Sequence, residues 1–193
     1  MRVAAVGIGG AGGRIIDTLY QDNASRSVSY LTGVSALDTD QAALSALTAV
    51  PEDSRHVFGQ VKTKGAGTDG DRELAIAAAE ADLLETRRAI DSAITSDTDA
   101  IILAAGLGGG IGSGATHRFA KALKDVYEIP IYTVSVLPAP HEDVPPENPA
   151  WGLQALHSVV DAQLIFDNKV WLDADAVIDE AADELNQTLV QRL

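Results

Sequence analysis

The sequence contains no cysteine, and this absence excludes three kinds of chemistry at once. Without cysteine there are no disulfide bonds, no thiolate metal ligands and no thiol nucleophile. The four histidines include no pair with the spacing of metal ligands, and no serine lies in the context of a nucleophile elbow. The sequence therefore predicts no residue for covalent catalysis.

Basic side chains are also scarce, because lysine and arginine total 14 against 28 aspartate and glutamate residues, for a net charge of −14. This balance argues against a nucleic-acid partner, since phosphate contacts require lysine and arginine. Aspartate outnumbers glutamate about two to one, a composition that resembles the solvated surface of a protein from a high-salt cytoplasm. An ordinary acidic protein is an equally good interpretation, so both stay open.

Long apolar runs are missing as well. No segment approaches the roughly 20 apolar residues that cross a bilayer, and the N-terminal residues do not follow the pattern of a signal peptide. Hydrophobic residues still make up 46% of the chain, enough for the core of one α/β domain. We therefore expect a soluble, cytoplasmic protein without membrane insertion.

Glycine, by contrast, is abundant, and residues 103–116 hold six of the 17 glycines. The apolar run 99–105 before them is suited to a strand that is buried on both faces. The residues after them, 116–127, have the apolar spacing of an amphipathic helix. A glycine-rich turn between a buried strand and a helix lets backbone N–H groups approach a phosphate chain, whereas a flexible linker would have neither neighbour.

A second unit of the same kind begins the chain. A short strand over 2–7 runs into the glycines of 7–13, and a helix follows over 14–20. The glycines at 7, 9 and 12 satisfy the G-x-G-x-x-G pattern, which nicotinamide and flavin enzymes share. A dinucleotide-binding oxidoreductase therefore remains an alternative at this point.

The next segments suggest a metal contact and a third glycine loop. A strand over 29–37 leads to the turn 38–40, where Asp38 or Thr39 is expected to cap the following helix. The alternative role of this turn is contact of Asp38 and Asp40 with Mg²⁺ through water. A minor strand is expected over 57–61. The glycine-rich loop 64–70 then precedes a long alanine-rich helix over about 72–96.

The second half continues the alternation of strands and helices. A buried strand is expected over 129–137, an ordered proline-rich loop over 138–149, a helix over 151–160 and a strand over 162–166. Glu142 and Glu147 of the loop are candidates to receive ribose hydroxyls. The pattern predicts an α/β fold, with a mainly parallel sheet, helices on both faces and the glycine loops at one edge. A last helix over 176–193 follows the domain of residues 1–175 and would lead into a further domain.

The order of these segments resembles the nucleotide-binding half of the tubulin/FtsZ superfamily of GTPases. The run 108–114 is similar to the family's glycine signature, GGGTG[ST]G. The first loop, the turn 38–40, the glycines of 65–67 and the proline-rich loop follow in the family's order. Residues 137–139 and 164–171 look closest to CetZ, the archaeal tubulin-like branch.

The resemblance implies that GTP or GDP binds with Mg²⁺ among the three loops. Asn168 and Asn186 resemble the two asparagines with which the family reads guanine. The implied phosphate contacts are Gly9, Gly10, Ala11, Gly12, Gly13, Ala66, Gly67, Thr68, Gly108, Gly109, Gly110, Ile111, Gly112 and Ser113. Two positions depart from the family: Ile111 replaces the threonine of the signature, and Ala182 stands where tubulins often carry an aromatic residue against the base.

The resemblance also implies head-to-tail polymerisation, in which acids of a neighbouring subunit complete GTP hydrolysis. Those acids lie in a family loop after the last helix, beyond residue 193. We therefore expect these residues to bind GTP with negligible hydrolysis, to contain no catalytic residue and to be largely monomeric. An NAD-type oxidoreductase domain and an interaction module without nucleotide are the alternatives.

Overall fold

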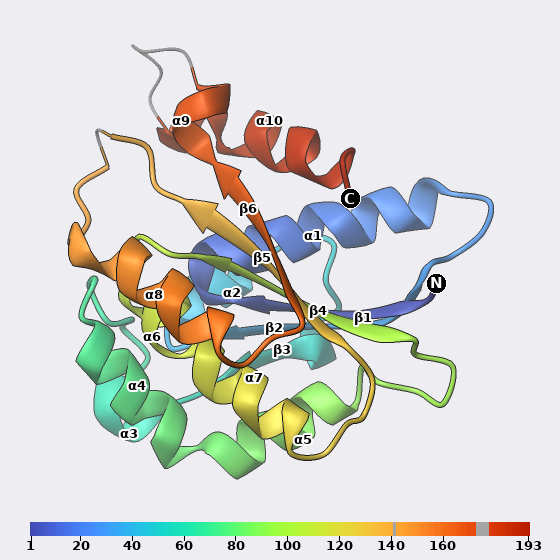
Figure 1. Cartoon of the computed structure of the whole chain (residues 1–193), viewed down its shortest axis with the longest axis horizontal. Helices are drawn as coiled ribbons and strands as arrows, with labels where there is room; N and C mark the ends of the chain where they lie inside the picture. Colours follow the sequence, from blue (N-terminus) through green and yellow to red (C-terminus); the bar gives the residue numbers. More distant parts are fainter. Residues whose placement is uncertain (141, 173–177) are drawn as a thin grey trace.

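The computed structural model of the chain describes residues 1–140, 142–172 and 178–193. These residues contain a six-stranded sheet in the order β3-β2-β1-β4-β5-β6, in which every neighbouring pair of strands is parallel (Figure 1). The strands are β1 (Val3–Ile8), β2 (Leu31–Asp38), β3 (Arg55–Val57), β4 (Ala100–Gly106), β5 (Ile131–Leu137) and β6 (Ala162–Asp167). The α/β fold that the sequence predicts is confirmed.

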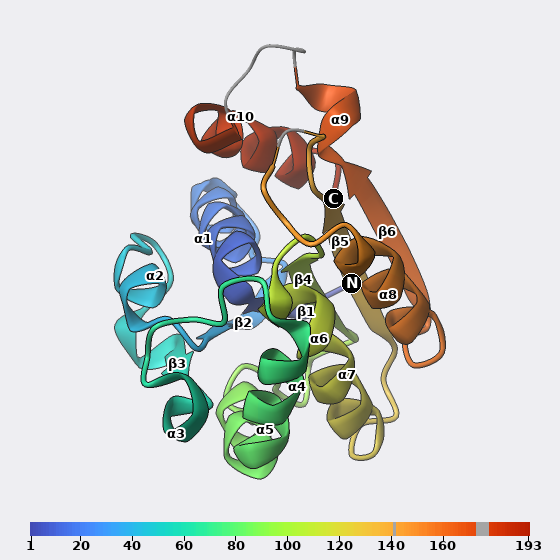
Figure 2. The ribbon, with the colours of Figure 1, turned by 90° about the vertical axis from the view of Figure 1, so that its left-hand side faces the viewer.

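Helices cover both faces of this sheet, with α1, α2 and α10 on one face and α4 to α8 on the other (Figure 2). A parallel sheet needs this double cover because both faces of its strands are apolar. The helices described are α1 (Gly9–Ser25), α2 (Gln41–Ser45), η1 (Glu52–Ser54, a 3-10 turn), α3 (Gln60–Thr63), α4 (Arg72–Ala81), α5 (Leu83–Asp91), α6 (Gly110–Gly114), α7 (Thr116–Lys124), α8 (Glu147–His157), α9 (Asn168–Trp171) and α10 (Ile178–Val190).

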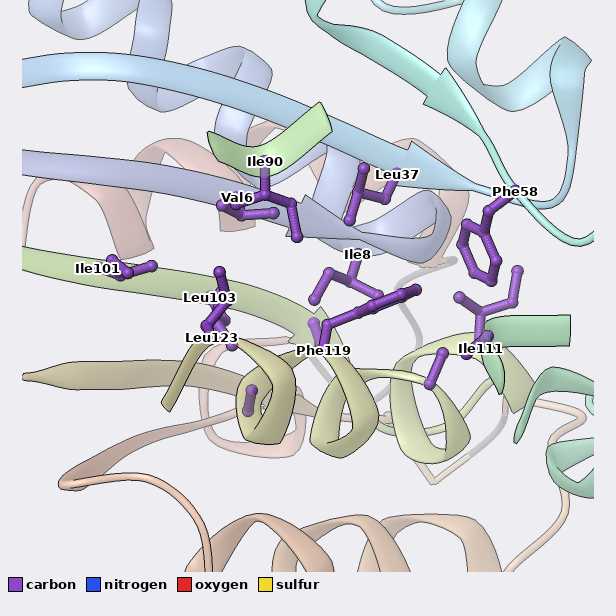
Figure 3. Close-up of a cluster of buried hydrophobic side chains, with 14 of the residues drawn as sticks. Val6, Ile8, Leu37, Phe58, Ile90, Ile101, Leu103, Ile111, Phe119 and Leu123 are labelled. Carbon is purple, nitrogen blue, oxygen red and sulfur yellow. The ribbon is translucent and has the colours of Figure 1, made fainter. Parts of the chain in front are cut away.

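Each face has its own apolar core. On the α1 side, Ile15 and Leu19 of α1 belong to the same buried cluster as Leu185 and Leu189 of α10. On the other side, the rings of Phe58 and Phe119 meet edge to face, with centroids 5.1 Å apart (Figure 3). The two cores fix α1 and α6 against the carboxyl ends of β1 and β4.

Two glycines permit the tight packing of these helices on the strands. A Cβ atom at Gly12 would overlap the carbonyl oxygen of Ala104 in β4. A Cβ atom at Gly112 would overlap the carbonyl oxygen of Gly106 and lie 2.8 Å from its carbon. Because the obstacles are backbone atoms, only glycine allows these approaches.

The prediction of one long helix over 72–96 is wrong, because Asp82 divides this segment into α4 and α5. The Asp82 carboxylate accepts the N–H of Gly59 at 2.7 Å and leaves the helical conformation, with φ −115° and ψ 20°. This contact joins segments that lie 23 residues apart. No local sequence pattern predicts such a break.

Other boundaries differ from the expectations. The minor strand lies at Arg55–Val57 rather than over 57–61, where α3 begins at Gln60. Both glycine runs are partly helical, since α1 begins at Gly9 and α6 spans Gly110–Gly114. The proline-rich segment ends earlier than expected, because α8 begins at Glu147. The helix after the signature ends at Lys124, before the exposed Val126.

The last helix, α10, ends at Val190 rather than at the final residue. Its expected start at residue 176 and the domain boundary at 175 lie outside the described residues. None of the helices in the described ranges is long and apolar enough to cross a membrane.

Candidate functional site

A cavity of about 420 Å³ lies at the carboxyl edge of the sheet. Strands β1, β2, β4 and β5 all end on it, and Ile8, Asp38, Gly106 and Val136 contribute to its wall. The helix after β1 covers one face of the sheet, and the helices after β4 cover the other. The strand order changes direction between β1 and β4, because β2 and β3 follow on one side of β1 whereas β4, β5 and β6 follow on the other. Open α/β sheets bind ligands at this type of position.

The walls nearest to β1 and β4 are the first turns of α1 and α6. The first N–H groups of any helix lack partners within the helix. Within the described residues no side chain caps α1 or α6, because Ile8 and Gly109 occupy their N-cap positions. Helices α2 and α4 differ, since Asp40 and Asp71 cap them. The N–H groups around Gly9–Ala11 and Gly109–Ile111 therefore line a cavity without a capping carboxylate.

The third glycine loop forms another wall through Gly67, Thr68, Asp69 and Gly70. Gly67, Asp69 and Gly70 have positive φ angles of 82°, 47° and 77°. The loop packs closely on α6, because a Cβ at Gly110 would lie 2.6 Å from the Thr68 hydroxyl oxygen. The signature and the third loop thus meet in one surface, although about 40 residues separate them.

Polar side chains from three later segments complete the cavity. Two of these segments, α9 and α10, lie next to each other and away from α4 (Figure 1). Asn168 begins α9 directly after β6, and Asn186 belongs to α10. Glu142 also lines the cavity, and its Oε1 atom accepts the N–H of Ala139 at 2.5 Å. Ala182 lies on the wall beside them, and its side chain is only a methyl group.

Asp38 is a buried acid of the site with a raised pKa. Burial raises its pKa to about 6, against the opposing hydrogen bonds from the N–H groups of Asp40 and Thr39. Its Oδ1 atom accepts the Asp40 N–H at 2.9 Å, and its side chain is nearly inaccessible to water. A cation in the cavity would favour the ionised form of this carboxyl group.

Asp40 is the cap of α2, a role that the sequence assigned to Asp38 or to Thr39. Its Oδ1 atom accepts the N–H groups of Ala42 and Ala43 at 2.8 and 3.3 Å. The described residues hold no cluster of three or more acids and histidines that could bind a metal by themselves. They do fit Mg²⁺ in its usual form, in which one or two carboxylates act together with substrate phosphates and water.

Most of the residues that the sequence singled out meet at this one cavity. Those that line it are Gly9, Gly10, Ala11, Asp38, Asp40, Gly67, Thr68, Gly108, Gly109, Gly110, Ile111, Gly112, Glu142, Asn168 and Asn186.

Five of the singled-out residues do not belong to the lining of this cavity. Gly12 and Gly13 are buried residues of α1, Ala66 is exposed, and Glu147 is exposed at the start of α8. The Ser113 hydroxyl points back along its own helix, where it donates to the Gly109 carbonyl at 2.6 Å.

Two charged residues of the lining were missed. Arg14 lies one helical turn after Gly10, so the spacing along α1 could have identified it. Asp69 belongs to the third loop and also lines the cavity, so it adds an acidic residue to the lining. The three loops therefore offer a further acid besides the donor groups and hydroxyls that the sequence emphasised.

The fold and the cavity together define an α/β domain of the class that takes its ligand at the carboxyl ends of parallel strands. The family model "Tubulin/FtsZ family, GTPase domain" matches residues 2–175, and the chain belongs to this family.

Similar proteins agree with this assignment. The tubulin-like protein CetZ5 of Haloferax volcanii is 40% identical over 194 residues, which cover 100% of this chain and 49% of that protein. The GDP-bound monomer structure of CetZ1 from the same organism has a TM-score of 0.94 at 34% identity, over 99% of this chain and 58% of that chain. The GTPγS-bound protofilament structure of CetZ2 has a TM-score of 0.92 at 31% identity, over 100% and 57% of the two chains. The chain spans about half the length of the curated relatives it matches.

Proposed function

We propose that this chain is the guanine-nucleotide-binding part of a CetZ-like cytoskeletal GTPase. The observation that carries the proposal is the cavity itself, in which the first turns of α1 and α6 meet the third loop at one end and two asparagines at the other. N–H groups at a helix start favour phosphate, and amide side chains offer paired donors and acceptors to a base. The similar structures of CetZ1 and CetZ2 are bound to GDP and to GTPγS, which supports the same ligand class here.

In this proposal each part of the cavity has its own role. The backbone of Gly9–Ala11 and of Gly108–Gly112 holds the phosphates, and Gly67 and Thr68 reach the terminal one. Mg²⁺, held through water near Asp38 and Asp40, supplies positive charge that neutralises phosphate oxygens.

The other groups hold the nucleoside. Glu142 receives a ribose hydroxyl, and its place in the lining favours it over Glu147. Asn168 and Asn186 read guanine. Ile111 removes a hydroxyl from the signature but leaves its backbone donors in place, and its side chain packs in the core.

Calorimetric titration with GTP, ATP and NAD tests the ligand class. We expect binding of GTP with Mg²⁺ and a clear preference over both competitors. Preference for NAD would restore the oxidoreductase alternative, which the family assignment does not favour. Binding of none of the three would indicate an interaction module.

We further propose that the whole protein assembles head to tail in the cytoplasm. A contact between two different faces does not close on itself and generates a filament. A neighbouring subunit's acids would then complete hydrolysis at the nucleotide. The protofilament structure of CetZ2, a similar protein, supports self-association of this kind. For these 193 residues alone we expect little assembly in light scattering with GTP, and cooperative scattering would contradict that expectation.

A further inference from the structure

Asn148 lies outside the cavity lining but contacts two of the loops that form it. It is the second residue of α8 and is only 1% exposed. Its Nδ2 atom donates to the carbonyl oxygen of Gly70 at 3.0 Å and to that of Gly108 at 3.0 Å. One side chain thus joins the end of the third loop to the beginning of the signature.

The chemistry of this position requires an amide. Two carbonyl oxygens surround the same atom, and both can only accept hydrogen bonds. The NH₂ group of Asn148 supplies two donors from one nitrogen, whereas a hydroxyl supplies one and an ionised carboxylate supplies none. A carboxylate here would also bring negative charge against two carbonyl dipoles in a buried place.

The neighbours of Asn148 support the same two loops by packing. A Cβ atom at Gly70 would lie 3.1 Å from Pro145, and one at Gly108 would lie 3.3 Å from Val144. The N–H of Asn148 donates to the Pro145 carbonyl at 3.1 Å, which holds the start of α8 next to Val144 and Pro145. Helix α8 lies beside α6 in both views (Figures 1 and 2).

We propose that Asn148 is a positioning residue that sets the spacing between the third loop and the signature, and so favours a nucleoside triphosphate over a diphosphate. The inference rests on the proposed function. Thr68 and Gly67 of the third loop would meet the terminal phosphate, which the diphosphate lacks. Without the Asn148 bonds, a loop with positive φ at Gly67, Asp69 and Gly70 is free to move away from α6.

The test compares the affinities of GTPγS and GDP by calorimetry in wild type, Asn148→Ala and Gln163→Ala. Gln163 is the matched control, because its Nε2 atom also donates to a carbonyl of α8, that of Leu153 at 3.1 Å, but away from the cavity. For Asn148→Ala we expect about tenfold weaker GTPγS binding, while GDP binding changes less than about threefold. For Gln163→Ala we expect less than about twofold change in both.

Equal losses for GTPγS and GDP in Asn148→Ala would overturn the inference, because a merely structural role lowers both affinities together. No loss at all would overturn it as well. Asn148→Ser keeps one donor without adding charge, and it carries the same comparison if the alanine variant does not fold. If the wild type binds neither nucleotide, the proposed function itself fails, and this outcome is distinct from a failure of the Asn148 variants alone.

Discussion

Gly112 and Gly109 belong to the same glycine signature but are predicted to respond to alanine in different ways. The Cβ atom of Gly112→Ala would overlap the Gly106 carbonyl oxygen and lie 2.8 and 3.2 Å from the carbon and nitrogen of the same residue. All three obstacles are backbone atoms of β4. At Gly109 no atom lies within 4 Å of the position that a Cβ would take, and φ is −76°.

The expected cost at Gly112 follows from this geometry. Overpacking a core usually costs about 1–3 kcal/mol, and more where the backbone has to shift. Relief of the overlap requires α6 to separate from β4, which also disturbs its buried contacts with Gly106. We therefore expect Gly112→Ala to lower the free energy of unfolding by about 3–5 kcal/mol, a large part of the 5–15 kcal/mol of a typical domain.

Urea unfolding followed by tryptophan fluorescence and circular dichroism measures this difference. Gly109→Ala is the matched control, since its methyl group enters the open cavity instead of the core. It should leave the free energy of unfolding within about 0.5 kcal/mol and weaken nucleotide binding. A Gly112→Ala protein within about 1 kcal/mol of wild type would refute the reasoning, because the helix would then tolerate the extra atom.

Three further predictions concern acids and turnover. The Asp17 carboxylate accepts the N–H groups of Thr48, Ala49 and Val50 at 2.8–3.1 Å. Burial opposes the ionisation of Asp17, but these hydrogen bonds outweigh it and lower the pKa. Asp17→Asn should therefore cost about 1–2 kcal/mol at pH 7, a difference that fades in urea titrations as the pH falls through the lowered pKa below 3.8. For Asp38 the pH dependence of stability has the opposite sign, because its pKa of about 6 lies above the value of 3.8 in the unfolded chain. The ligand-free protein should therefore lose about 2–3 kcal/mol of stability as the pH rises from 4 to 6. Asp38→Asn should abolish that loss in EDTA, and an unchanged pH profile would exclude Asp38 as its source. Phosphate release from excess GTP with Mg²⁺ at high salt should stay near background for these 193 residues. It should rise when a separate protein is added that carries the other half of a full-length relative. Rapid turnover by the 193 residues alone would contradict this prediction and direct attention to Asp38 and Asp69.

The parallel sheet was predictable because its signals are local. Short apolar runs, each followed by glycines or an acid and then by an amphipathic segment, indicate strands that end at one edge. The clustering of the three glycine loops at that edge follows from the topology alone. The same logic placed Asn168 at the site, because it directly follows β6.

The features that were missed have causes distant in the sequence. The break at Asp82 depends on the Gly59 N–H, and the role of Asp40 as a cap depends on where β2 ends. Glu142 and Glu147 are equivalent in the sequence, and only the start of α8 separates them. Asn148 gives no motif signal, since its two partners lie 78 and 40 residues away.

The central claim is that Asn168 and Asn186 recognise guanine at one end of the cavity. The most direct measurement is the ratio of GTP affinity to ATP affinity, in wild type and in the double variant Asn168→Ala/Asn186→Ala. A site that pairs with polar groups of its ligand rejects a mismatched ligand strongly, so we predict a wild-type ratio of about 100 or more. The double variant should bind both nucleotides weakly and almost equally through the phosphate loops. A wild-type ratio near one, or a double variant that retains the preference for GTP, would contradict the account.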